Sequence, residues 1–85
     1  MDSILAKIKE SIEAPLKEMD IFVDSVTWEL ENNYYYLKIV LDKVNGIDLD
    51  TIVEATNIIN PIIDKLDLID DQYILDIVSR ERGDK

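Results

Sequence analysis

Carboxylates are the residues of this sequence with the most potential for chemistry. The 85 residues carry 19 acidic and nine basic side chains, a formal net charge of −10, and neither cysteine nor histidine. This composition removes the thiolate nucleophile, the usual general base and the commonest zinc ligands. Two carboxylates can act as acid and base, but a chain this acidic forms such pairs by chance. We therefore expect no enzyme activity, and a hydrolase using aspartate pairs is the least favoured interpretation.

Two specific binding motifs are also missing. An EF-hand loop around Gly46 would need oxygen ligands where Leu41 and Lys43 stand. A phosphate-binding loop needs several glycines, and Gly46 and Gly83 are the only two in the chain. The sequence thus predicts neither a metal site nor a cofactor.

The acids gather in the second half of the chain. Residues 42–79 hold nine acids, opposed only by Lys43 and Lys65. Such a segment repels nucleic-acid phosphates, so we do not expect direct RNA contact. It is either a solvated surface or a face that attracts a basic protein.

The first of these acids, Asp42, Asp48 and Asp50, lie in a segment, residues 34–50, that is expected to form a strand, a turn and the start of a helix. Alternation predicts a strand over 34–41, Asn45-Gly46 suits a tight turn, and Asp48 can cap the helix that follows. The strand residues expected to share one face are Tyr35, Leu37, Ile39 and Leu41.

Periodicity places the remaining elements. Pro15 predicts a kink or early end in the first helix, and Pro61 a kink or two shorter helices in the second. A polar loop at 31–33 suits a hairpin. The expected elements are a helix over 2–19, strands over 22–30 and 34–41, a helix from residue 49, and a strand over 72–78. The fold class is therefore an α/β two-layer (α+β) domain of α-β-β-α-β order, with two helices on one face of a three-stranded sheet.

The aromatic residues invite a second interpretation. Trp28 together with residues 34–36, all tyrosines, resembles a base-stacking platform. Only Lys38 accompanies them as a strand cation, so cross-strand packing is the better account. Tyr34 and Tyr36, if exposed, remain possible anchors for a protein partner.

With the elements placed, the sequence resembles the N-terminal domain of the RimP family of ribosome maturation factors. Ala14-Pro15 leads from a helix end into a strand, as in that family. Residues 37–42, followed by 46–50, are similar to the family's strand ending in Asp, then Gly-Ile and an acidic helix start. Leu66-Asp67 and residues 73–79 resemble its Leu-Asp and Tyr-x-Leu-Glu-Val-Ser-Ser pattern. Together these stretches span nearly all 85 residues in the family's order.

The chain also departs from the family pattern. Residues 78–81 replace the usual Ser-Ser-Pro-Gly, which puts a contact made by that loop in doubt, and Ile52 replaces a common Cys. The family has a C-terminal Sm-like barrel, for which these 85 residues leave no room. We expect residues 1–79 to form the RimP N-terminal-like domain, and 80–85 a polar tail or the start of a linker. The sequence fits either an excised domain or a natural short form.

The resemblance implies a non-catalytic factor that binds the immature small (30S) ribosomal subunit during ribosome biogenesis, with a basic ribosomal protein as its contact. There is no apolar run long enough to span a membrane and no signal-peptide block, so a cytoplasmic location is expected. The candidate partner-binding residues are Asp48, Asp50, Glu54, Asp76, Ser79 and Arg80. The alternative is a free-standing acidic α/β protein-interaction module, which could pair as a homodimer through an exposed sheet edge.

Overall fold

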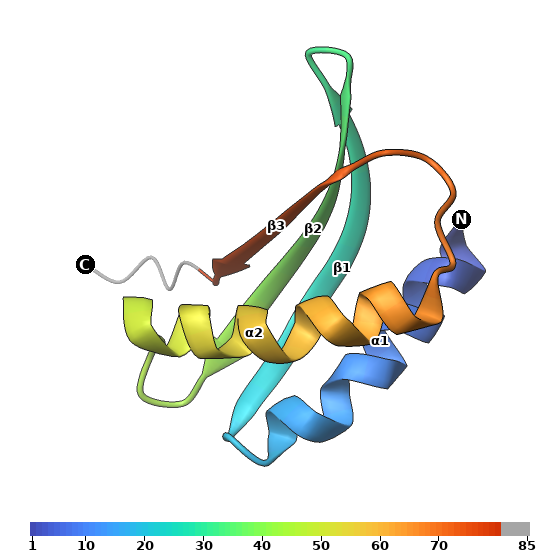
Figure 1. The fold of residues 1–85 in the computed structure, drawn as a ribbon. Coiled ribbons are helices and arrows are strands. Elements are labelled where there is room, and N and C mark those ends of the chain that lie inside the picture. The colour runs from blue at the N-terminus through green and yellow to red at the C-terminus, as the bar shows by residue number, and fades with distance from the viewer. Residues whose placement is uncertain (81–85) are drawn as a thin grey trace.

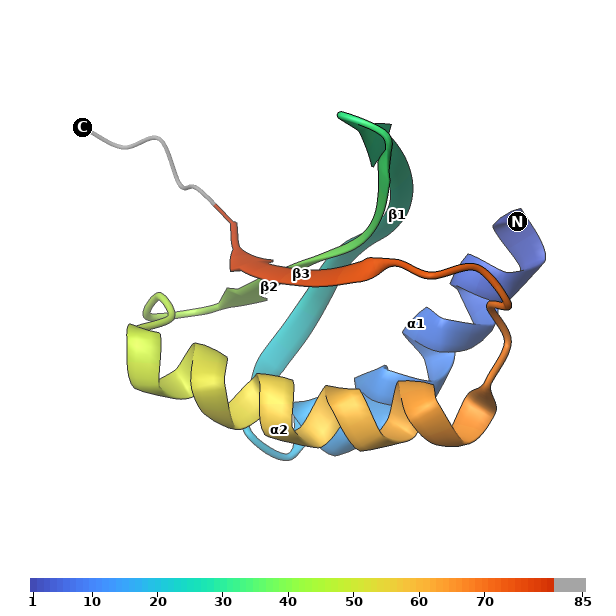
Figure 2. The same cartoon turned by 45° about the horizontal axis from the view of Figure 1, so that its top comes forward.

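The structure is a computed structural model, and it describes residues 1–80. Both helices lie on one face of a three-stranded sheet (Figures 1 and 2), so the predicted two-layer α+β fold is confirmed. Most of the expected polar tail, from residue 81 onward, lies outside the described residues. The elements in chain order are α1 (Asp2–Lys17), β1 (Ile21–Glu31), β2 (Tyr34–Lys43), α2 (Leu49–Leu66) and β3 (Ile74–Ser79).

The sheet is mixed, with β2 at its centre. β1 pairs with β2 in antiparallel fashion, while β3 pairs with β2 in parallel fashion, with Tyr36 opposite Ile74 and Leu41 opposite Ser79. Since parallel neighbours need a crossover, α2 makes the connection from β2 to β3. The strand order β1-β2-β3 leaves β1 and β3 as the two sheet edges.

The hairpin between β1 and β2 follows the prediction closely. Glu31 pairs with Tyr34, so Asn32 and Asn33 alone form the turn. Their φ angles are 52° and 70°, and two successive positive values define the turn that matches the twist of a hairpin. Asparagine is among the few residues that adopt this conformation readily.

The core lies between the sheet and the helices. On β2, the side chains of Leu37, Ile39 and Leu41 are fully buried, as the alternation predicts. Each such side chain contributes about 1.5–3 kcal/mol through removal of its surface from water. The buried helix residues that cover them are Ile8, Ile12 and Leu16 on α1, and Ala55, Ile59 and Ile63 on α2.

Both prolines lie inside helices. α1 continues through Pro15 and ends at Lys17, two residues short of the predicted end at residue 19. α2 continues through Pro61 to Leu66, so the alternative of two shorter helices is wrong. Pro61 and Asn57 are both exposed, and water can therefore bond the Asn57 carbonyl that the proline leaves without a donor.

The opposite face of the sheet has no covering layer within residues 1–80 (Figure 2). Phe22 and Ile74 are 51% and 44% exposed there. Thr27, Lys38 and Asp76 occupy successive strands at one level of the sheet. We call this surface the open face.

Candidate functional site

The acidic start of α2 is built by a turn and a helix cap. The Gly46 N–H donates to the Lys43 carbonyl over 2.9 Å, and Gly46 has a φ of 86°, which favours glycine. Asp48 then adopts an extended conformation, and its Oδ1 accepts the Thr51 N–H at 2.8 Å. The predicted helix cap is therefore confirmed, and it fixes the direction in which α2 leaves the sheet.

The electrostatics of this helix start favour negative charge. Hydrogen bonding from Thr51 lowers the pKa of Asp48, and the positive charge of Lys43 lowers it further. Asp50 lies in the first helical turn, where the helix dipole also stabilises an anion. The carboxylate of Asp48 is thus ionised at neutral pH and already has a structural role.

Apolar side chains accompany these acids on the surface. Val44, Leu49 and Val53 are 73%, 77% and 52% exposed. Leu49 and Val53 are four residues apart and share one side of α2, next to the side that carries Asp50 and Glu54. This strip was not predicted from the sequence, although its apolar residues fall off the buried stripe of α2 and could have been found on that basis.

The end of β3 is tied to the other two strands through Arg80. Its backbone N–H donates to the Leu41 carbonyl at 2.6 Å, and its guanidinium lies 3.2 Å from Asp24 Oδ1 and 4.0 Å from Asp42 Oδ2. The Arg80 side chain is 55% exposed, so solvent weakens these ion pairs. Arg80 therefore has a structural contact as well as exposure to a partner.

Five of the six candidate residues form two groups, and Asp76 lies apart from both. Asp48, Asp50 and Glu54 lie at the start of α2, whereas Ser79 and Arg80 lie at the end of β3, at the same end of the domain (Figures 1 and 2). Asp76 alternates with the core-packed Leu75 and Ile77, and so it lies on the open face opposite Lys38. The structure thus separates Asp76 from the acids of α2 by the thickness of the sheet.

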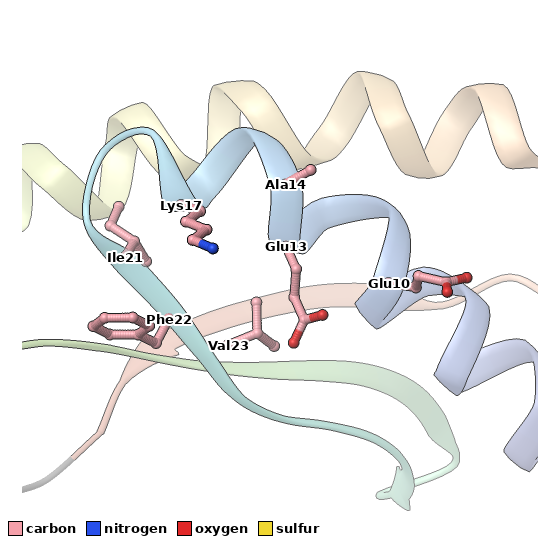
Figure 3. A pocket seen from close by; sticks show the side chains of 7 residues that line it. All are labelled: Glu10, Glu13, Ala14, Lys17, Ile21, Phe22 and Val23. Carbon is pink, nitrogen blue, oxygen red and sulfur yellow. The ribbon is translucent and has the colours of Figure 1, made fainter.

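A hollow in the described surface lies elsewhere. It is a groove of about 560 Å³ between α1 and β1, lined by Glu10, Glu13, Ala14, Lys17, Ile21, Phe22 and Val23 (Figure 3). We call it the α1–β1 groove. The sequence did not predict this groove, because it forms only when the helix packs on the strand.

The aromatic residues pack against one another at the hairpin end of the sheet. The rings of Trp28 and Tyr35 stack with centroids 5.0 Å apart, and Tyr73 contacts Trp28 edge-on at 5.7 Å. Cross-strand packing, the favoured interpretation of Trp28 and Tyr35, is therefore observed. Burial raises the pKa of Tyr73, and the charges of Asp64 and Asp67 raise it further.

Two classes of site were also sought among residues 1–80. No group of three or more acidic side chains there is arranged to hold a metal ion. Neither helix in that part of the chain has the length and apolarity that crossing a bilayer requires.

The fold and the surface define a small acidic two-layer α+β domain that offers a helix start and a groove. Comparison with family models gives a match to the RimP N-terminal domain over residues 11–80. That match spans α1 from its middle, all three strands and the whole of α2. The chain therefore belongs to the RimP N-terminal domain family, a family of non-enzymatic ribosome maturation factors.

Proposed function

We propose that this chain is a non-catalytic maturation factor that docks on the immature small ribosomal subunit in the cytoplasm. The family match over residues 11–80 is the observation that carries this proposal. In this proposal residues 1–79 are the docking domain and 80–85 begin a polar tail. The chain needs no cofactor for such a role, because its action is binding.

The proposed contact is a basic ribosomal protein on the acidic start of α2. Asp50 and Glu54 supply negative charge, and the neighbouring Leu49 and Val53 supply exposed apolar surface. Interfaces commonly combine an apolar centre with a charged rim, so this strip suits a partner carrying lysine or arginine around an apolar residue. Ser79 and Arg80 at the end of β3 would extend the contact, and Asp76 would join only if the partner reached the open face.

Binding there would favour one local arrangement of protein and RNA on the immature particle. A ligand shifts such an equilibrium only by its differential affinity for the two states. The factor would therefore bind immature subunits more tightly than mature ones and leave as the subunit matures. The net charge of −10 would keep the domain away from bare RNA.

The test is co-sedimentation of the purified chain with immature and with mature small subunits across a salt series. We expect selective binding to immature particles that weakens as salt rises. The variant Asp50→Lys/Glu54→Lys should abolish binding while the Asp48 cap stays intact. The matched control Asp70→Lys/Asp71→Lys makes the same charge change in an exposed loop and should bind almost normally.

Two results would count against the proposal. If the wild-type chain binds neither particle at any salt concentration, docking by this domain is wrong. If the α2 variant binds like its control, the docking function stands but the surface has been wrongly assigned. Circular dichroism of each variant checks that the fold is retained.

A further inference from the structure

The α1–β1 groove combines an orderly row of helix side chains with an open strand edge. Glu10, Glu13, Ala14 and Lys17 recur at intervals of three, four and seven residues from the first, so they form one stripe along α1. This stripe lies beside the buried stripe of Ile8, Ile12 and Leu16. The packing that buries α1 therefore directs the second stripe towards β1.

The floor of the groove is the beginning of an edge strand. Ile21 and Val23 are 1% and 8% exposed because their side chains face the helices. β1 has β2 on one side and no strand on the other within residues 1–80. The outer backbone groups of such an edge are the template on which an extended peptide can add as a further strand.

Within residues 1–80, the charged side chains along the wall form no salt bridge. Glu13 and Lys17 extend from α1 towards β1 (Figure 3). Neither Glu10 nor Glu13 forms a salt bridge within the described residues, although Glu13 and Lys17 have helix spacing that allows one. Two unpaired carboxylates near a free edge are complementary to a basic segment.

We propose that the α1–β1 groove binds an extended, lysine- or arginine-bearing segment of a partner protein. The segment lies along the edge of β1 at residues 21–23, with its basic side chains against Glu10 and Glu13. The register shift between Val23 and Ser25 limits the length of this pairing, because a bulge interrupts the regular edge. Ala14 leaves room for the segment, and Phe22, 51% exposed, borders it on the other side.

A second copy of this chain is a poorer occupant. Each copy carries a net charge of −10, so pairing two β1 edges would bring like charges together. The groove is lined by residues of α1 and β1 alone, so peptide binding there does not depend on the ribosomal role or on the surface of α2.

The experiment measures binding of fluorescein-labelled peptides to the whole chain by fluorescence anisotropy. The probe is a seven-residue peptide of alternating lysine and valine, and its controls replace lysine with glutamate or methylate the backbone nitrogens that would pair with β1. We expect a Kd below about 1 mM for the lysine peptide. Both controls should bind at least several-fold more weakly. Amide chemical-shift changes should centre on residues 21–23.

Variants give opposite expected effects. Glu10→Gln/Glu13→Gln should weaken binding about tenfold, because two exposed charge contacts are lost and each is worth roughly threefold in affinity. Lys17→Gln should strengthen it, because it removes a like charge. Ala14→Trp should fill the groove and abolish binding. Asp70→Asn/Asp71→Asn is the matched control, since it removes two exposed carboxylates from the loop before β3 and should change little.

Three outcomes would overturn the proposal. The first is no binding of the lysine peptide at 1 mM. The second is equal weakening by the Glu10→Gln/Glu13→Gln variant and by the Asp70→Asn/Asp71→Asn control, which would reveal only general attraction to an acidic protein. The third is a concentration-dependent dimer in sedimentation that Ala14→Trp dissolves, which would assign the groove to a second copy. Subunit co-sedimentation can succeed or fail independently of all three.

Discussion

Replacing Ile39 with alanine would test the two-layer arrangement most directly. Ile39 is fully buried at the centre of β2, opposite Val26 on β1 and Ile77 on β3. Its neighbour Val40 points to the open face and is half-buried. The two residues are adjacent in sequence and similar in type. Alanine substitutions at these positions therefore differ mainly in which face of the sheet loses a side chain.

The expected magnitudes differ clearly. Ile39→Ala leaves a cavity between sheet and helices and should cost about 3–4 kcal/mol. The whole domain is expected to have roughly 4–13 kcal/mol of stability, in proportion to its 85 residues. Val40→Ala should cost about 1 kcal/mol, because water can occupy the space it leaves.

Urea unfolding, followed by the fluorescence of Trp28, the single tryptophan, measures the loss of stability in both variants. With a slope of about 1–1.5 kcal/mol per molar urea, Ile39→Ala should lower the midpoint by about 2–4 M, and Val40→Ala by under about 1 M. Val44→Ala, at a 73% exposed position, is the surface control. Equal shifts for Ile39→Ala and Val40→Ala would refute the assignment of a covered and an open face.

Three further changes test individual contacts. Asp48→Ala removes the acceptor for Thr51 and should lower the melting temperature by roughly 4–8 °C. Because the folded-state pKa of Asp48 is lowered, its ionised form stabilises the fold above the ordinary value of 3.8, and the advantage of wild type over Asp48→Asn should shrink in melts taken below that pH. Asn33→Val forces a β-branched residue to a φ of 70° and should cost about 1–2 kcal/mol in urea unfolding, while Asn33→Gly should be nearly neutral; equal losses would contradict the turn assignment. Arg80→Ala should cost less than about 1 kcal/mol, and 1 M NaCl should remove most of that loss, because the ion pair with Asp24 is exposed.

The predictable parts of the fold rest on local chemistry. The alternation around Ile39 defines a strand with one buried face, and Asp48 before an apolar helix stripe defines a cap. Asn32 and Asn33 can adopt the positive φ values of a tight hairpin. Each of these features depends on neighbours within a few residues, so the sequence pattern was sufficient.

The unpredicted parts arise from packing between distant segments. The ion pair of Arg80 with Asp24 joins residues 56 positions apart, and nothing local signals it. The α1–β1 groove likewise depends on how the helix sits over the strand. The alternative of two shorter helices at Pro61 was wrong for a related reason, because the tolerance of a helix for proline depends on which side of the helix faces water.

The parallel pairing of β2 with β3 has a consequence for how the chain folds. The β1–β2 hairpin closes over two residues, whereas Tyr36 meets Ile74 only across 38 intervening steps of the chain. Closing that long loop costs conformational entropy before the β2–β3 pairing stabilises the chain. We therefore expect β3 to join the sheet late in folding. During synthesis, β2 would remain an unprotected strand edge until residues 74–79 emerge. Part of the apolar side of α2 would therefore stay exposed to water until β3 joins the sheet.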